Sequence, residues 1–244
     1  MPTYRLDLAY DGTGFRGLAR QGGQRTIQGE VEAALARTLR AEVATVAAGR
    51  TDAGVHARQQ VMSFSFDKAI EASKLLNSLT RQLRPEVVPY SLAEVDEGFD
   101  ARRSAISRTY RYQINNAAIP NPLTRHSEWH IAEPLDVGAM DLGVGAILGE
   151  HDFASFCRAS STGGTVRRVL AAEWSRTHQV TLAVRANAFC HQMIRSIVGL
   201  SVDIGRGRRR SGDMAVVMTG RDRNHAGQMA PAHGLILWEV TYET

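Results

Sequence analysis

The stretch Tyr4–Tyr10, YRLDLAY, sets the pattern from which the fold of this 244-residue chain is predicted. Apolar and aromatic side chains occupy every second position, and charged or small residues stand between them. Because successive side chains of a strand point to opposite faces, this alternation predicts a half-buried β-strand. The segments that follow it in the sequence then decide what kind of sheet this strand joins.

After Thr26, a possible helix N-cap, the spacing of apolar residues changes to that of a helix. The residues at this spacing are Ile27, Val31, Ala34, Leu35 and Leu39. Two predicted strands, Val43–Ala48 and Val61–Phe66, come next, and a second helix begins near Ala72 and stops before Pro85. With a strand at Val87–Val95 the order is β-α-β-β-α-β, which is the ferredoxin-like unit.

The second half of the chain repeats this order without an obvious repeat of the residues themselves. The predicted elements are a strand at Arg108–Ile114, a helix over 137–148, strands at Val166–Trp174 and Val180–Ala186, a helix from Met193 to Val198 and a strand at Leu235–Tyr242. We therefore predict an α+β protein of two ferredoxin-like halves, 1–104 and 105–244, whose antiparallel sheets flank a central cleft.

Composition excludes several classes of protein. No run approaches the roughly 18 consecutive apolar residues that cross a bilayer, and the N-terminus lacks the layout of a secretion signal. Cys157 and Cys190 are the only cysteines and form no C-x-x-C pair, which argues against a disulfide scaffold or a four-thiolate zinc site. We expect a cytoplasmic protein that is not attached to a membrane.

The basic residues are almost all arginine, because only Lys68 and Lys74 among the 29 are lysines. They cluster at 102–111, 167–168 and 206–210, and the net charge is +4. Genome base composition is one explanation of this preference. The other is that guanidinium groups bind phosphates bidentately and stack on bases, as RNA binding requires.

The loop AGRTDAGVHA (48–57) joins two predicted strands and carries a single acid, Asp52. One interpretation is a tight connection in which Asp52 caps its own backbone and the glycines supply unusual dihedral angles. The other is a functional carboxylate, which the charge of Arg50 beside it keeps ionised. Such a carboxylate near a cleft serves as a nucleophile or a base.

Further motifs accompany this loop along nearly the whole chain. They are YDGTGFRG (10–17), TIQGEVEAAL (26–35), SRTYRYQI (107–114), EHDFASFC (150–157), AFCHQMIRSIVG (188–199) and APAHGLILWEV (230–240). Together with GRTDAGVHA (49–57), in this order, they resemble the motifs of the tRNA pseudouridine synthase A family. The sequence departs from the family pattern at Leu18, where the family often has tryptophan, and this affects a local RNA or packing contact.

The resemblance implies isomerisation of uridine to pseudouridine in the anticodon stem and loop of tRNA, at positions thirty-eight, thirty-nine and forty. It implies no cofactor, and the sequence has neither a phosphate-binding loop of the G-x-x-x-x-G-K-[ST] type nor a dinucleotide fingerprint. The histidines lack the spacings of known zinc hydrolases and deaminases, so we expect no metal. The expected partners are tRNA and a second copy of the chain in a homodimer.

Three catalytic residues carry over from the family by motif. Asp52 is the catalytic carboxylate, Tyr110 stacks on the target base and assists proton transfer, and Arg195 pairs with Asp52. From the residues alone, Tyr110 is equally well a core aromatic on one strand face. For Arg195 the spacing by itself favours a solvated helix face.

The resemblance also indicates RNA contacts at Arg50, which fills the space of the flipped nucleotide, and at Arg20, His56, Arg108 and Tyr110. Two other functions stay open on the sequence. A non-catalytic arginine-rich RNA-binding protein would not need Asp52. A cofactor-free hydrolase of a small anionic ligand would not need the long basic tracts.

Overall fold

The computed structural model describes residues 1–158 and 164–243. The chain divides into two compact units, Met1–Ile106 with Ile236–Thr244, and Ser107–Leu235. The expected halves, 1–104 and 105–244, differ from these units chiefly in the last strand, which groups with the first unit. Each unit is described by itself below.

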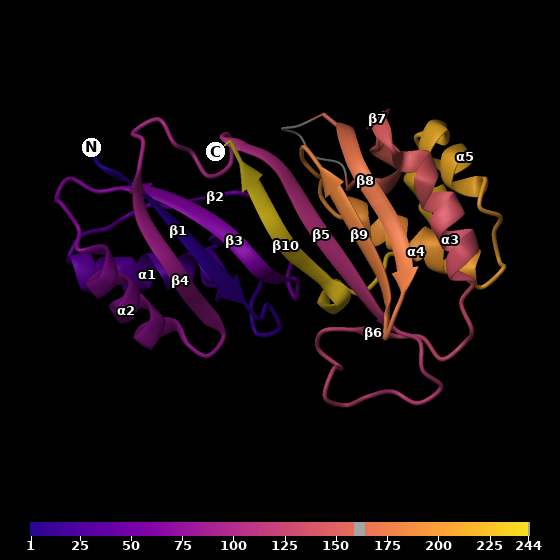
Figure 1. The fold of residues 1–244 in the computed structure, drawn as a ribbon, viewed down its shortest axis with the longest axis horizontal. Helices are drawn as coiled ribbons and strands as arrows, with labels where there is room; N and C mark the ends of the chain where they lie inside the picture. Colours follow the sequence, from indigo (N-terminus) through magenta and orange to yellow (C-terminus); the bar gives the residue numbers. More distant parts are fainter. Residues whose placement is uncertain (159–163, 244) are drawn as a thin grey trace. The chain divides into compact units, whose positions relative to one another are not determined.

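The first unit contains β1 (Thr3–Tyr10), α1 (Ile27–Leu39), β2 (Val46–Ala47), β3 (His56–Ser65), α2 (Ala72–Leu83), β4 (Val87–Val95) and β10 (Leu235–Tyr242). β1 is the central strand and pairs antiparallel with β3 and with β4. Two strands share the other edge of β3, namely β2 antiparallel at one end and β10 parallel at the other. α1 and α2 pack together against this sheet (Figure 1). The predicted β-α-β-β-α-β order is confirmed.

The sequence signals of this unit act as expected at β1 and α1. The alternating residues Tyr4, Leu6, Leu8 and Tyr10 are all buried. Asp7, on the opposite face, is also largely buried, and β1 has a paired strand on each side. Arg5 Nε donates to Asp7 at 3.0 Å, but burial still raises the pKa of the Asp7 carboxyl. Thr26 caps α1, and its hydroxyl accepts from the Gly29 amide.

The second unit is built on four antiparallel strands in the order β5-β9-β8-β7, and a short β6 pairs parallel with β5. Its strands are β5 (Ala105–Asn115), β6 (Trp129–His130), β7 (Gly149–Asp152), β8 (Val166–Arg176) and β9 (Val180–Ala186). Its helices are α3 (Val137–Val144), α4 (Met193–Gly205) and α5 (Asp213–Gly220), with short 3-10 turns at Gly145–Ile147, Ala154–Phe156, Arg223–Ala226 and Ala232–Gly234. α3 packs on β8 and on α4.

The α+β class is therefore confirmed, while several bounds differ from the prediction. The strand expected at Val43–Ala48 pairs only at Val46–Ala47. The helix expected over 137–148 ends at Val144 and tightens into a 3-10 turn. The polar segment 157–165, before the strand predicted at Val166–Trp174, includes residues 159–163, which lie outside the described residues. Within the described part of the chain, no helix has the length and apolar character needed to cross a membrane.

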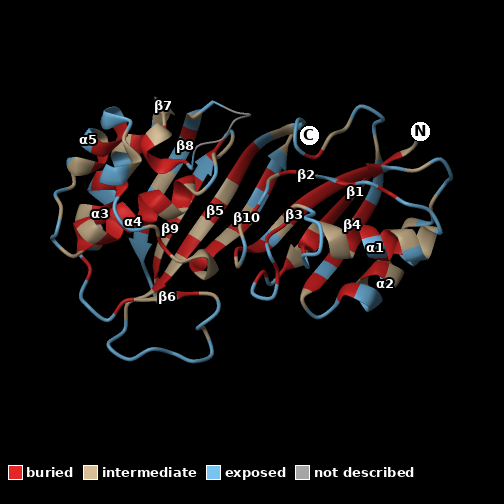
Figure 2. Cartoon of the chain, turned by 180° about the vertical axis from the view of Figure 1, so that it is seen from behind, coloured by how far each residue is buried: buried red, intermediate tan, exposed pale blue. Residues whose placement is uncertain are grey.

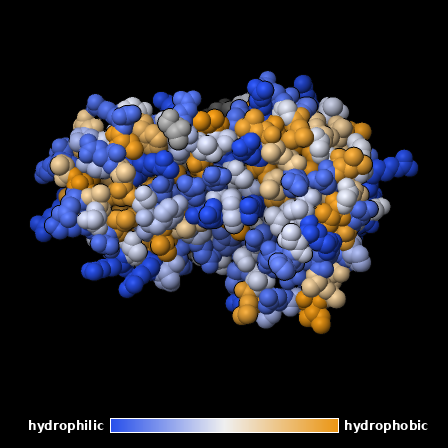
Figure 3. All heavy atoms as spheres, viewed as in Figure 1, coloured by the Kyte–Doolittle hydropathy of each residue, from blue (hydrophilic) through white to orange (hydrophobic). Residues whose placement is uncertain are grey.

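In both units the buried residues concentrate on the strands and on the helix faces turned toward them (Figure 2). The visible surface is mostly hydrophilic, with scattered apolar patches (Figure 3). One patch lies at the lower edge of that view, over the long loop between β5 and β6, where Ile119 and Leu123 are exposed.

Candidate active site

Asp52 lies on the loop between β2 and β3, as the sequence predicted, and its side chain is half-buried. The loop leaves the sheet with the Ala48 amide bonded to the Val61 carbonyl at 2.8 Å. It returns through a turn in which the Val55 amide donates to the Asp52 carbonyl at 3.1 Å. Both ends of the loop are thus fixed by backbone hydrogen bonds, and Asp52 stands in the turn between them.

The loop packs closely on the segment that follows β1. The Leu18 amide donates to the Thr51 carbonyl at 3.1 Å. Gly17 has a φ of +96°, and a Cβ there would lie 3.0 Å from the same carbonyl oxygen. A Cβ on Gly12 would lie only 2.1 Å from the carbonyl oxygen of Val55. These glycines of the YDGTGFRG motif therefore allow the backbone beside Asp52 to come this close.

His56 begins β3 and is buried. Its Nδ1 atom lies 3.1 Å from the Gly12 amide nitrogen and 3.1 Å from Asp11 Oδ1. The Gly12 amide donates to Nδ1 when that nitrogen carries no hydrogen, and an Nδ1–H group would instead donate to the Asp11 carboxylate. Either contact ties β3 to the segment after β1.

Arg50 and Arg20 are both exposed, which leaves their guanidinium groups available to an anionic ligand. Arg50 stands two residues before Asp52 on the same loop. Arg20 Nη1 lies 3.4 Å from Glu32 Oε2, and its backbone amide donates to Gln28 at 3.2 Å. Arg20 is therefore anchored to α1 by its backbone while most of its side chain faces solvent.

Tyr110 lies on the buried face of β5, which it shares with Arg108 and Tyr112. Its ring meets that of Phe189 edge to face, with centroids 5.1 Å apart and an interplanar angle of 82°. Arg108 is also buried and donates from Nη1 to the Asn187 carbonyl at 2.8 Å. Tyr110 and Arg108 thus both contact the segment between β9 and α4.

Arg195 lies in the first turn of α4 and is held by the segment before the last 3-10 turn. Its Nε donates to the Ala230 carbonyl at 2.8 Å, and its own carbonyl accepts from the Ala230 amide at 3.0 Å. Burial raises the pKa of Tyr112, and the positive charge of Arg195 partly opposes that rise. Arg195 is therefore more fixed than the solvated helix residue that its spacing alone allows.

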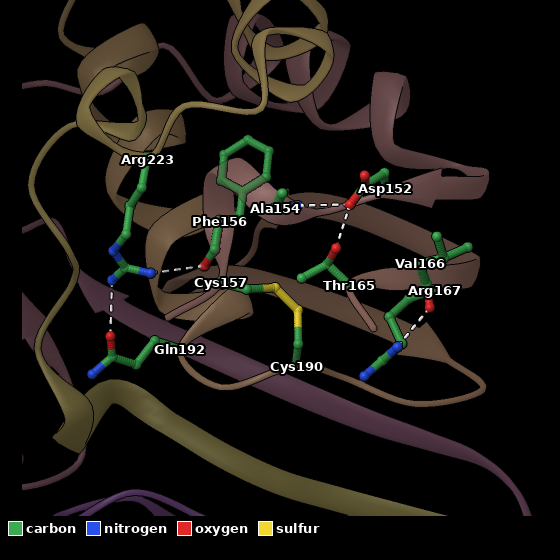
Figure 4. Close-up of a disulfide and its surroundings, with 10 residues drawn as sticks. All are labelled: Asp152, Ala154, Phe156, Cys157, Thr165, Val166, Arg167, Cys190, Gln192 and Arg223. Carbon is green, nitrogen blue, oxygen red and sulfur yellow. Dashed lines mark hydrogen bonds between the residues drawn. A yellow bond between two sulfur atoms is a disulfide. The ribbon is translucent and has the colours of Figure 1, made fainter. Parts of the chain in front are cut away.

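A cross-linked segment leads into α4. Cys157 and Cys190 form a disulfide with their Cα atoms 5.8 Å apart (Figure 4). The two cysteines are 33 residues apart, and no spacing motif in the sequence indicates this bond. The disulfide joins two local segments and does not form a scaffold for the chain. Beside it Arg223 donates to Gln192 Oε1 at 2.8 Å and to the Phe156 carbonyl at 3.5 Å.

The structure groups the predicted site residues by unit. Asp52, Arg50, His56 and Arg20 belong to the first unit, and Tyr110, Arg108 and Arg195 belong to the second. Within residues 1–158 and 164–243, no three histidine, cysteine or carboxylate side chains gather in a way that could hold a metal ion. Phe189 stands in the AFCHQMIRSIVG motif, but nothing in the sequence marks it as the ring that contacts Tyr110. Nor does the sequence indicate a role for Thr51 or Tyr10.

Comparison with known proteins adds the family. The family model described as tRNA pseudouridine synthase matches residues 144–243. The chain is 40% identical to tRNA pseudouridine synthase A of Shouchella clausii, over 96% of this chain and 91% of that protein. It is 39% identical to the protein of that name from Brevibacillus brevis, over 99% and 100%. For the Frankia casuarinae protein the identity is 44%, over 98% and 88%.

Proposed function

The chain belongs to the tRNA pseudouridine synthase A family, and we propose that it isomerises uridine at positions thirty-eight, thirty-nine and forty of tRNA, with Asp52 as the catalytic carboxylate. The observation that carries the assignment of Asp52 is its place in a turn anchored at both ends, with its side chain only half-buried. A carboxylate presented in this way is positioned before the substrate binds.

The reaction breaks the bond between N1 of the uracil and C1′ of the ribose and forms a bond from C5 to C1′. The proton on C5 leaves and N1 gains one, so there is no net redox change. Asp52 acts either by forming a covalent adduct with the sugar or the base, or by removing a sugar proton so that a glycal forms. Both routes need an ionised carboxylate.

Tyr110 and Arg195 complete the proposed catalytic set. The Tyr110 ring meets Phe189 edge to face and is only 6% exposed, so stacking on the target base requires neighbouring side chains to move aside. One such stack contributes about 1–3 kcal/mol. Arg195 supplies a guanidinium group as the third member of the set. The proposal therefore requires both halves, 1–104 with Asp52 and 105–244 with Tyr110 and Arg195.

Further RNA contacts are proposed at Arg50, Arg20, His56 and Arg108. Arg50 takes the space of the extruded nucleotide, and Arg20 reaches a phosphate. Arg108 and His56 are each only 8% exposed, so their proposed contact with RNA is limited to the small part of each side chain that reaches the surface. In this proposal the protein works as a cytoplasmic homodimer, and one tRNA contacts both subunits. Light scattering with and without tRNA measures the molar mass and so tests the dimer and its binding of one tRNA.

The test of Asp52 is its replacement by asparagine, which keeps the shape and removes the charge. We expect Asp52→Asn to abolish pseudouridine formation, measured by release of label from C5 of uridine in tRNA. Affinity for tRNA should fall by less than tenfold, about 1.4 kcal/mol, because the phosphate contacts remain. Mapping the modified positions in wild-type product checks positions thirty-eight to forty.

Asp67→Asn is the matched control, because Asp67 is an exposed acid in a loop of the same unit. It removes the same charge and should leave turnover unchanged. Turnover in Asp52→Asn close to that of Asp67→Asn would rule out the assignment of Asp52. Absence of label release from the wild-type protein, with tRNA still bound, would instead favour the non-catalytic RNA-binding function.

A further inference from the structure

Three polar side chains, one in the loop that carries Asp52 and two in the strands next to it, are buried together. Tyr10 ends β1, Thr51 directly precedes Asp52, and Gln60 lies in the middle of β3. Their exposed fractions are only 4%, 8% and 0%. Apolar side chains fill the neighbouring positions of β1, so three polar groups together at this point call for an explanation.

The three side chains form a connected set of hydrogen bonds. The hydroxyl groups of Tyr10 and Thr51 are 2.8 Å apart. The Gln60 amide nitrogen donates to the Gly49 carbonyl at 2.9 Å and, more weakly, to the Tyr10 hydroxyl at 3.5 Å. The Gln60 side-chain oxygen accepts from the Val61 amide at 3.1 Å. Tyr10 and Gln60 therefore hold the loop at two points, Gly49 and Thr51.

The direction of the hydrogen bonds follows from which groups can donate. Gln60 uses its amide nitrogen on Gly49 and Tyr10, so the Tyr10 hydroxyl accepts there and is free to donate to Thr51. Burial raises the pKa of Tyr10 to about 12, and this keeps its proton in place through the neutral range. The set does not change its charge at the pH at which the enzyme works.

Thr51 is held through its backbone as well. Its carbonyl accepts from the Leu18 amide on one side, while its hydroxyl meets Tyr10 on the other. With both of its groups bound, Thr51 has little freedom to rotate, and the next residue in the chain is Asp52. A loop that only connected two strands would be as well served by apolar side chains at these positions.

We propose that Tyr10, Thr51 and Gln60 are positioning residues that fix the Asp52 carboxylate in its reactive place. This inference rests on the proposed function, in which Asp52 is the catalytic group. Its physical reason is that a catalytic group displaced by about 1 Å costs on the order of a hundredfold in rate. In this role none of the three needs to touch the substrate, because each acts through the loop on either side of Asp52.

Tyr10→Phe is the first test, because it removes one hydroxyl and keeps the ring. We expect the single-turnover rate at saturating tRNA to fall about tenfold or more, with the Kd for tRNA within twofold of wild type. Tyr4→Phe is the matched control. Tyr4 is buried on the same face of β1, and its hydroxyl accepts from the Ile70 amide at 3.1 Å, away from Asp52.

Thr51→Val and Thr51→Ser form a second pair, which keeps the inference testable if Tyr10→Phe is poorly folded. Valine has the shape of threonine without its hydroxyl, and serine keeps the hydroxyl. We expect the single-turnover rate of Thr51→Val to fall, as for Tyr10→Phe, and that of Thr51→Ser to stay within about threefold of wild type. All rates are taken well below each variant's Tm, so that loss of stability alone does not change them.

Equal rates for Tyr10→Phe and Tyr4→Phe, or for Thr51→Val and Thr51→Ser, would overturn the inference. Asp52→Asn is measured in the same series to separate the two ideas. If Asp52→Asn stays active, the proposed function is wrong and the positioning role falls with it. If Asp52→Asn is inactive while the paired variants match their controls, only the positioning role is wrong.

Discussion

The buried phenol of Tyr10 couples the folding of the first unit to pH. Burial disfavours the phenolate and raises the pKa of Tyr10 from 10.0 to about 12, and hydrogen bonds with Thr51 and Gln60 lower it only in part. The folded state therefore holds this proton more tightly than the unfolded state. Its contribution to stability is complete below pH 10 and is lost as the pH rises toward 12.

We predict that Tyr10→Phe weakens the alkaline loss of stability. In wild type the free energy of unfolding should fall between pH 10 and 12, by up to about 3 kcal/mol from Tyr10 if two pKa units are realised. The variant has no phenol to ionise at this position, so its curve should be flatter. Urea unfolding at several pH values measures this. If the free energy of unfolding fell equally with pH in wild type and Tyr10→Phe, the prediction would be wrong.

Asp52 can be located from the sequence, whereas the residues that support it cannot. A single acid among glycines and arginines marks a turn and a candidate carboxylate from local sequence alone. The contact between Tyr10 and Thr51 joins residues 41 positions apart. Such a contact depends on the pairing of β1 with β3, and no local pattern specifies which polar residues this pairing brings together.

Among the elements, the long periodic ones were predictable and the short polar ones were not. β1, α1 and β5 follow from spacing, and Thr26 marks where α1 begins. β7 is only four residues long, GEHD, and its alternation is too short to detect. α5 has eight residues and no side-chain cap, so neither its period nor its start is visible in the sequence.

Helix α4 carries Arg195, and its position depends on Gly199. A Cβ on Gly199 would lie 1.8 Å from the carbonyl oxygen of Gln228, and the backbone would have to move apart. We predict that Gly199→Ala destabilises the protein by about 1–3 kcal/mol or more through overpacking. The gain in helix propensity, about 1 kcal/mol, does not offset this cost.

Gly220→Ala is the control for this prediction. Gly220 ends α5, and apart from its chain neighbours and the adjacent backbone of α5 no atom lies within 4 Å of the place that its Cβ would take. We expect this change to be neutral or slightly stabilising, because only the propensity gain acts. Thermal unfolding of both variants compares them directly. A Tm for Gly199→Ala at or above that of Gly220→Ala would show that α4 does not need this close approach.

Fewer arginine side chains are available to bind RNA than the number of arginines in the sequence suggests. Arg108 is buried, and Arg167 is half-buried with its pKa lowered by burial. Arg206 pairs with Glu133 at 3.0 Å and is only 19% exposed. Arg208 and Arg210, in the same loop, are exposed, so they are the members of that cluster best placed to meet phosphates.

Binding of tRNA should therefore weaken steeply with salt, and Arg208 and Arg210 should account for part of the slope. Each neutralised phosphate releases counterions and contributes roughly −0.7 to −0.9 to the slope of log affinity against log salt. If both side chains bind phosphates, Arg208→Ala with Arg210→Ala should reduce the slope by about 1.4 to 1.8. Lys74→Ala with Arg81→Ala, on exposed positions of α2, removes the same charge elsewhere. The affinity for tRNA is measured by titration at several salt concentrations. All variants carry Asp52→Asn as well, so that no turnover occurs during the titration. Both double variants lose two positive charges, so a general effect of net charge would change their slopes equally. Equal slopes would therefore mean that Arg208 and Arg210 are solvated and do not bind phosphates.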